Sequence, residues 1–304
     1  MRHPCSAARA LSTVAMLATL TLCACGGGSP DESASGDQPA ASPRPVTCMP
    51  KPSACGYPDA TNTGVPRGTR LERVDGTVEL RSPGMVYSGR EVHGQIRVLA
   101  RDVTIEKVRV VSDAYYPIST FGEDKQPTGT VIRDVEIDMQ GQEEAKGIAF
   151  DNYAATRVWF HNGLDCAHAG TNVVITDSFC DLPRLPSGSS AHADGFQSDG
   201  GANQVFRHNT IRNPNGQTSA ILLSTNTAPI DKVVIEDNLM SGGGYTVYCG
   251  TGEGGVATNT TYTNNVISRE FFPNGGHWGA TTGCDGAVKG SGNGWDGPRD
   301  DSPQ

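Results

Sequence analysis

The chain has 304 residues, with 33 Asp and Glu against 24 Lys and Arg, which gives a formal net charge of −9. An acidic surface repels phosphate backbones and anionic lipid headgroups, so this balance argues against nucleic acid as a partner. Beyond residue 25 the sequence has no run of the roughly 20 apolar residues that a membrane-spanning helix needs. It therefore predicts a soluble domain.

Residues 1–25 have the pattern of a secretory signal peptide. Arg2 and Arg9 precede an apolar run, Leu11–Leu22, which is too short to span a membrane. The run ends in Leu-Cys-Ala-Cys, which resembles a bacterial lipobox and implies that Cys25 carries a lipid at the mature N-terminus. We expect an exported cell-surface lipoprotein that contacts the membrane only through this anchor. The alternative is an ordinary signal peptide cut nearby, which would release a secreted protein.

Residues 26–46 are rich in Gly, Ser, Pro and Asp and predict a disordered tether. We expect residues 47–304 to form one domain, because a repeat fold grows by adding units and needs no second core. Removal of residues 1–24 takes away two basic and no acidic side chains. It leaves 22 basic against 33 acidic side chains, a net charge of −11.

The central stretch, residues 192–211, sets the pattern for the domain. A short alternating strand, Gly195–Ser198, is followed by a Gly-Gly turn and a second alternating strand, Gln204–Arg207. With this copy the second strand occurs seven times; the other copies are residues 103–110, 130–137, 156–162, 172–179, 232–239 and 260–267.

The first strand also recurs, each time with one apolar residue that we expect to point inward. These residues are Ile96, Ile118, Ile148, Ala167, Phe196, Ile221 and Val247, at spacings of 22, 30, 19, 29, 25 and 26. An irregular period carried by strands is typical of a parallel β-helix with loops inserted at its corners. Asn209, Asn238 and Asn265 fall at corners, where Asn suits tight bends and can stack into ladders.

Six cysteines follow the tether, and an even number in an exported chain predicts disulfides. Six cysteines allow 15 pairings. Of these we expect Cys48 with Cys55, Cys166 with Cys180, and Cys249 with Cys284.

The C-terminal tail, Gly275–Pro298, is rich in Gly and is expected to cover the open end of the ladder. Its aromatic residues include Trp278 and Trp295. We expect them to pack within the cap; the alternative is that they serve as platforms for sugar rings.

Three motifs give the chain a resemblance to a known family. They are Cys55-Gly-Tyr-Pro-Asp, His192-Ala-Asp-Gly-Phe-Gln and Gly242-Gly-Gly-Tyr-Thr. From about Gly64 to Trp295, roughly three quarters of its length, the chain resembles the pectin-lyase-like superfamily, and in particular a bacterial secreted group with an His-x-Asp-Gly-Ile-Gln motif. The resemblance implies an all-β, right-handed parallel β-helix, for which the repeats indicate about seven to eight rungs. The superfamily includes lyases, hydrolases, epimerases and proteins without catalytic activity, so fold alone does not select a reaction.

In characterised relatives the polysaccharide lies along the outer face of the first sheet. Strict alternation from the inward residues places His168 and Gln197 side by side on that face. Asp199 then lies diagonally within reach, and Tyr248 lies farther along the same column. We expect this patch to be a groove for an extended polymer.

Asp165 and Asp194 occupy equivalent positions, two residues before an inward residue. Alternation points both toward the backbone of a corner, where the favoured role is to cap a turn. The alternative is a carboxylate pair for acid–base chemistry or for Ca²⁺. His192 follows a long loop, and it either overhangs the groove as a base or packs under that loop.

Lys146 is a candidate because of the resemblance. Lyases of this fold commonly use Lys or Arg to take the proton beside a uronate carboxylate, and Ca²⁺ neutralises that carboxylate. Two hallmarks of relatives are missing. The Asp-Asp and Arg-x-Lys motifs of polygalacturonase-type hydrolases are absent from the expected sheet, and the basic cluster of pectate and alginate lyases is thin. Neither mechanism is therefore carried over as a whole.

The sequence predicts a monomeric carbohydrate-active protein that cleaves a polysaccharide by elimination or hydrolysis. No cofactor is expected other than Ca²⁺, with Asp165 and Asp194 as its candidate ligands. The alternative is a glycan-binding or adhesive surface protein that uses the same groove without catalysis. The candidate catalytic residues are His168, His192, Asp194 and Asp199, and the candidate substrate-binding residues are Gln197, Tyr248 and Lys146.

Overall fold

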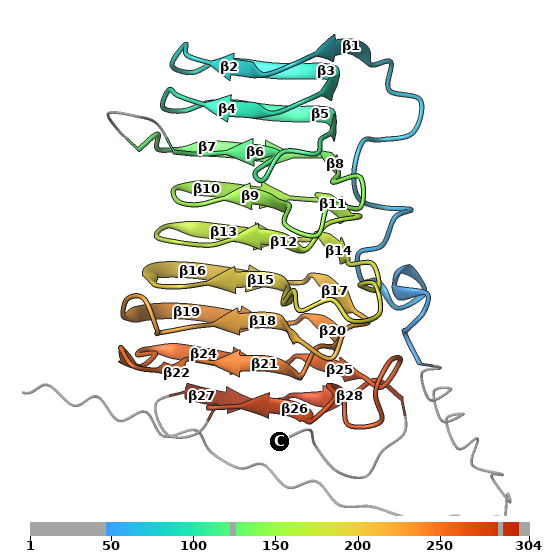
Figure 1. The fold of residues 1–304 in the computed structure, drawn as a ribbon, viewed down its shortest axis with the longest axis vertical. Coiled ribbons are helices and arrows are strands. Elements are labelled where there is room, and N and C mark those ends of the chain that lie inside the picture. Colours follow the sequence, from blue (N-terminus) through green and yellow to red (C-terminus); the bar gives the residue numbers. More distant parts are fainter. Residues whose placement is uncertain (1–46, 122–125, 285–287, 298–304) are drawn as a thin grey trace, which may run out of the picture. The chain divides into compact units, whose positions relative to one another are not determined.

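The computed structural model describes residues 47–121, 126–284 and 288–297. Within them the only helix is a short 3-10 turn, η1 (Pro52–Cys55), and all other elements are strands (Figure 1). Most strands belong to two long parallel sheets. The described chain is thus all-β, as the sequence predicts, and its parallel sheets are compatible with a parallel β-helix.

One sheet has nine strands and carries the first strand of each repeat. Its strands, in spatial and chain order, are β2 (Val78–Leu80), β4 (Ile96–Val98), β6 (Ile118–Ser119), β9 (Lys146–Ala149), β12 (Asp165–His168), β15 (Ala193–Ser198), β18 (Thr218–Leu223), β21 (Tyr245–Cys249) and β26 (Gly279–Thr282).

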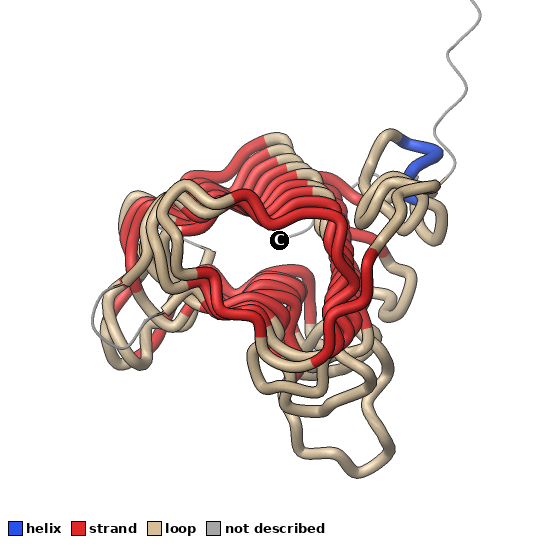
Figure 2. The backbone as a smooth tube through the Cα atoms, turned by 90° about the horizontal axis from the view of Figure 1, so that it is seen from above, coloured by secondary structure: helices blue, strands red, loops and turns tan. Residues whose placement is uncertain are grey.

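The other long sheet has seventeen strands, because it continues around a corner where β5 pairs with both β7 and β8. Viewed from above, the strands of successive turns superimpose (Figure 2). The members are β1 (Glu72–Asp75), β3 (Val86–His93), β5 (Thr104–Val111), β7 (Thr130–Arg133), β8 (Glu136–Asp138), β10 (Tyr153–Thr156), β11 (Trp159–His161), β13 (Val173–Thr176), β14 (Phe179–Asp181), β16 (Gly201–Arg207), β17 (Thr210–Asn213), β19 (Ile230–Glu236), β20 (Leu239–Gly242), β24 (Thr260–Thr263), β25 (Val266–Ser268), β27 (Val288–Ser291) and β28 (Gly294–Trp295). A separate antiparallel pair consists of β22 (Thr251–Gly252) and β23 (Gly255–Val256).

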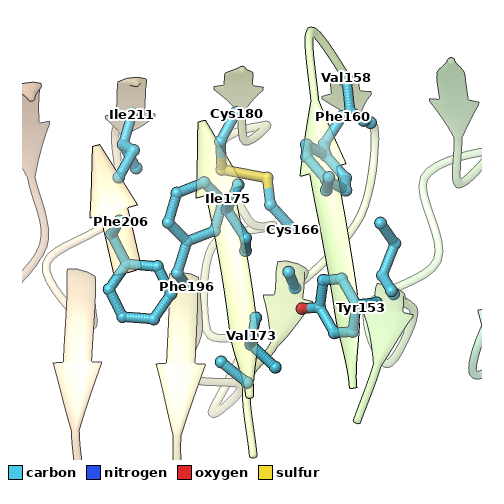
Figure 3. Close-up of a cluster of buried hydrophobic side chains, with 14 of the residues drawn as sticks. Tyr153, Val158, Phe160, Cys166, Val173, Ile175, Cys180, Phe196, Phe206 and Ile211 are labelled. Atoms are coloured by element: carbon cyan, nitrogen blue, oxygen red, sulfur yellow. A yellow bond between two sulfur atoms is a disulfide. The ribbon is translucent and has the colours of Figure 1, made fainter. Parts of the chain in front are cut away.

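The inward column of the nine-stranded sheet is the one that the spacing predicts. Ile118 pairs with Ile148, Ile148 with Ala167 and Ala167 with Phe196, and all are buried. Phe196 in turn stacks on Phe206 of the other sheet, with ring centroids 5.5 Å apart (Figure 3). Stacked coils therefore bury one continuous apolar column, which no single coil could do alone.

Buried asparagines join the coils at one corner. Asn209, Asn238 and Asn265 are buried and form a ladder with the half-buried Asn293. The side-chain oxygens of Asn238, Asn265 and Asn293 each accept the backbone N–H of the preceding Asn, at 2.9–3.0 Å. The Nδ2 group of Asn238 also donates to the carbonyl of Phe206, at 2.9 Å. The ladder satisfies backbone groups that the bend removes from the sheet.

The described residues contain three disulfides, and they join the pairs that the sequence leads us to expect. Cys48 is disulfide-bonded to Cys55. Cys166 is disulfide-bonded to Cys180 across the interior of one coil (Figure 3). Cys249 binds Cys284. Three disulfides indicate an oxidising or extracellular environment. The predicted signal peptide, the predicted lipid site Cys25 and the predicted tether lie outside the described residues. Within the described residues no helix is long and apolar enough to cross a membrane.

The segment before β1 runs across the outer side of several strands, which the sequence analysis did not predict (Figure 1). Cys48 and Met49 donate backbone N–H groups to the carboxylate of Asp296. Tyr57 stacks on His208 and donates its hydroxyl to Asp237, and Gly64 donates to the carbonyl of Arg157. The segment therefore fastens coils that are far apart in the sequence.

The C-terminal tail adds strands to both long sheets. Its described part contributes β26, β27 and β28, which pair in parallel with the preceding coil. Together with β2 at the other end, β26 extends the nine-stranded sheet beyond the seven strands that the apolar spacing identifies. In β26 the position that pairs with Val247 is Thr281, so this strand lacks the apolar residue that marks the other copies, although it buries Ala280.

Candidate functional site

The strands that carry the predicted site do not alternate strictly. Asp165 and His168 are three residues apart, yet their side chains lie 3.0 Å from each other, so both are on the same face of β12. The two residues between them, Cys166 and Ala167, are both inside, the first in a disulfide and the second in the apolar core. Two consecutive inward residues thus turn the preceding side chain to the outer face.

The neighbouring strands share this irregularity and use glycine for the first of the two inward residues. A Cβ atom on Gly195 would lie 2.4 Å from the side chain of Ile211, and one on Gly147 would lie 2.8 Å from the ring of Phe160. Both contacts are with core residues, which shows that these positions face the interior. Strict alternation places Asp165 and Asp194 on the inner side at a corner, and this expectation is wrong because the doubled inward position reverses it.

The reversal creates an outward column of polar side chains on four adjacent strands. Lys146 of β9 pairs in register with Asp165 of β12, and Asp194 of β15 pairs with Ser219 of β18. Lys146 Nζ lies 2.7 Å from Asp165 Oδ2, and Ser219 Oγ donates to Asp194 Oδ1 at 2.6 Å. The link between the two pairs is the backbone N–H of Asp194, which donates to Asp165 Oδ1 at 2.9 Å.

Asp165 is the centre of this network. Its side chain is fully buried, and Oδ2 lies within hydrogen-bond distance of both Lys146 Nζ and His168 Nε2. Burial of a carboxylate is costly unless it is paired and hydrogen-bonded, and here both oxygens have partners. The favoured capping role is therefore only partly right: Asp165 does accept a backbone N–H, but within the sheet rather than at a turn.

Asp194 has a different environment. Its side chain is buried, and burial raises the pKa of this carboxyl well above its usual range, with a further increase from the nearby negative charge of Asp165. The hydrogen bond from Ser219 works in the opposite direction but does not cancel the increase in pKa. A carboxyl with a raised pKa, next to one that is ion-paired, is the usual arrangement of a general acid.

His168 is held firmly against the network. Its ring meets the rings of Phe150 and Tyr116 edge-on, with centroids 5.6 and 6.4 Å away. Its backbone carbonyl accepts a hydrogen bond from the hydroxyl of Tyr153 at 2.9 Å. The imidazole is therefore oriented by aromatic contacts and by Asp165.

Two cavities open on the outer face over these strands. The larger, of about 610 Å³, is lined by residues that include Lys146, His192, Asp194, Gln197 and Tyr248. The smaller, of about 260 Å³, is lined by residues that include His168, Gln197 and Asp199. Gln197 borders both cavities.

Every predicted catalytic and substrate-binding residue therefore lines one of these cavities. His168 pairs in register with Gln197, as alternation predicts, and Gln197 Nε2 donates to Asp199 Oδ2 at 2.9 Å. His192 is exposed at the rim of the larger cavity. Asp165 lines neither cavity, because Lys146 and His168 cover it.

Sequence reasoning missed Ser219 and Tyr245 as members of the outward column. Both lie two residues before an inward residue, Ile221 and Val247, which is the same offset that singles out Asp165 and Asp194. That offset was the signal that could have found them. Aromatic neighbours such as Phe150 left no such signal, because they lie in loops of variable length.

The expected Ca²⁺ ligands, Asp165 and Asp194, have hydrogen-bond partners within the protein. Ca²⁺ takes six to eight oxygen ligands, whereas the oxygens of Asp165 are already engaged by Lys146, His168 and the amide of Asp194. The ammonium group of Lys146 would also repel a cation at this point. Among the described residues no group of three or more His, Cys, Asp and Glu side chains could hold a metal ion.

Comparison of this chain with models of known protein families, with curated proteins and with solved structures finds no match. The case for a function therefore rests on the geometry of the site.

Proposed function

We propose that the protein cleaves a polysaccharide by general acid–base chemistry at the outer face of its nine-stranded sheet. The observation that carries this proposal is Asp194, a buried carboxyl with a raised pKa that lines a cavity of about 610 Å³. Hydrolysis and elimination both expel a sugar oxygen that needs a proton, and a protonated carboxyl can supply it. Asp194 is the acid in this account.

The base is His168 or His192. His168 is oriented by Asp165, whose carboxylate stabilises the imidazolium that forms when the ring takes a proton. His192 is exposed at the rim of the larger cavity, where it can meet a proton or a water molecule above the sugar ring. Asp199 is a second carboxylate, held by Gln197, that can position a water molecule.

Substrate contacts follow from the lining of the cavities. Gln197 offers its amide oxygen to a sugar hydroxyl while its Nε2 holds Asp199. Tyr248 is half-buried in the larger cavity and offers an aromatic surface to a sugar ring. Lys146 brings a positive charge to the lining, which favours a polymer with carboxylate groups.

In this proposal the fold is a right-handed parallel β-helix of the pectin-lyase-like type, capped by its C-terminal tail. The protein is an exported monomer, either anchored through a lipid on Cys25 or secreted. Its partner is a polysaccharide rather than nucleic acid, and it needs no resident cofactor. The acidic charge of −9 argues against nucleic acid as a partner, and the three disulfides support an exported location.

The test is to incubate the purified protein with neutral and uronic polysaccharides and to follow reducing ends and the ultraviolet absorbance of unsaturated uronates. A rise in both signals identifies a lyase, and reducing ends alone identify a hydrolase. If neither signal rises on any polymer, the cleavage proposal is wrong and the alternative of a glycan-binding protein takes its place.

A further inference from the structure

A further hollow of about 540 Å³ lies on the protein beside the candidate site. Residues 184–191, from the long loop after β14, form one part of its lining, and the tail residues His277 and Trp278 form another. The remaining lining residues are Asn215, Gly216 and Gln217.

This hollow adjoins the larger cavity of the candidate site. Ala191 and Gln217 line the hollow, while the next residue along the chain in each case, His192 and Thr218, lines the larger cavity. Tyr245 lines the larger cavity too, and its ring centroid lies 6.3 Å from that of Trp278. A polymer chain that leaves one cavity can therefore enter the other.

Trp278 is a large apolar side chain that is 54% exposed. The sequence leads us to expect that it packs within the cap, but only Trp295 packs against the apolar core. Its backbone is nevertheless fixed, because its N–H donates to the carbonyl of Gly244 at 2.7 Å. A Cβ atom on Gly244 would lie 3.0 Å from the six-membered ring of Trp278, so the ring packs closely on that backbone.

We propose that Trp278 is the platform of a distal carbohydrate subsite, which holds a sugar ring of the same polymer that the Asp194 site cleaves. The inference rests on the proposed function for the identity of that polymer. The apolar C–H face of a sugar packs on a fixed aromatic ring, while exposed polar side chains hold its hydroxyl groups. Gln217 and Arg184 supply an amide and a guanidinium group in the same lining.

The loop that carries Arg184 is also held in place. The side-chain oxygen of Asn215 accepts the backbone N–H of Leu185 at 2.8 Å, and its amide group donates to the carbonyl of Pro183 at 3.0 Å. Both walls of the hollow are thus anchored before a ligand binds, which lowers the entropic cost of binding.

The experiment is native gel electrophoresis of the purified full chain through gels that contain polygalacturonate, alginate, xylan or glucomannan, one polymer per gel. Wild type is compared with Trp278→Ala, Trp278→Phe and Asp194→Asn, and Val86→Ala serves as the control because Val86 is also exposed but lies on β3. We expect at least one polymer to retard the wild type and Trp278→Ala to weaken that binding about tenfold. Trp278→Phe, which keeps a ring, and Val86→Ala should remain within about threefold of wild type.

Two results overturn the subsite: equal retardation of Trp278→Ala and wild type, or no retardation of wild type by any of the four polymers. Asp194→Asn separates this inference from the proposed function, because it should lose cleavage but keep retardation. If wild type is retarded through Trp278 yet cleaves none of the polymers, the subsite stands and the cleavage proposal fails. If wild type cleaves a polymer and Trp278→Ala binds that polymer equally well, the cleavage proposal stands and the subsite fails.

Discussion

The ammonium group of Lys146 lies 2.7 Å from a carboxylate oxygen of Asp165, and the two side chains are 10% and 0% exposed. Removal of one partner of such a pair leaves the other charge buried and uncompensated. We predict that Lys146→Met lowers the free energy of unfolding by about 3 kcal/mol, measured by urea denaturation. Arg73→Met removes a fully exposed ion pair and is the control, for which we expect little change. A loss for Lys146→Met as small as that of the control would contradict this account of the pair.

The raised pKa of Asp194 predicts that the stability of the protein depends on pH. The folded pKa of Asp194 is raised, so above the unfolded pKa the native state binds more protons than the unfolded state, and stability falls as pH rises through the folded pKa. Asp194→Asn mimics the protonated form, keeps an oxygen for Ser219 and removes this loss. The melting temperature of the variant relative to wild type should therefore increase from pH 4 to pH 8. A difference that stays constant over this range would show that Asp194 does not titrate as proposed.

His168 is predicted to act in catalysis rather than in folding. The hydrogen bond from Tyr153 reaches its backbone carbonyl and survives substitution of the side chain. We expect His168→Asn to lower kcat by about 100-fold while KM stays close to that of wild type. His208→Asn is the control, because His208 binds Asp177 at a distant corner. If kcat of His168→Asn falls no more than kcat of the control, His168 has no catalytic role.

The asparagine ladder predicts a large stability effect far from the site. Asn238 is fully buried; it accepts hydrogen bonds from Asn209 and donates to Phe206 and Asn265. We expect Asn238→Ala to cost about 3 kcal/mol, because several buried backbone groups lose their partner. Asn152, Asn172 and Asn203 form a second, exposed series, in which the amide of Asn172 donates to Asn152 and its oxygen accepts from Asn203. Asn172→Gly should cost less than about 1 kcal/mol, since the groups that it leaves can bond to water. Calorimetric melting of both variants checks the contrast.

The sequence predicts the fold well because the apolar column is local information. Each inward residue, such as Ile148 or Phe196, lies in a short strand flanked by recognisable turn residues. The strands of successive coils pair in register at these positions. Loop length does not disturb that register. The three disulfides also join the pairs that we expect; two of these pairs are close together in the sequence, with separations of 7 and 14 residues, and the third spans 35.

The site is less predictable because it depends on an exception to the repeat. Strict alternation identifies the column of His168 and Gln197, but it assigns the wrong face to Asp165 and Asp194. The cause is the doubled inward position at Cys166 and Ala167, which only packing reveals. Loops of irregular length bring Trp278 beside Tyr245, a contact with no local signal in the sequence.

The measurement that tests the central claim most directly is the rate of product release by wild type and by Asp194→Asn, on the same panel of neutral and uronic polysaccharides. We predict that the wild type cleaves at least one polymer and that the variant does so about 100-fold more slowly, because the proton donor is lost. The variant should remain folded, since the amide has nearly the shape of the carboxyl and keeps an oxygen for Ser219. Cleavage by Asp194→Asn at the wild-type rate, or no cleavage by the wild type, would contradict the account.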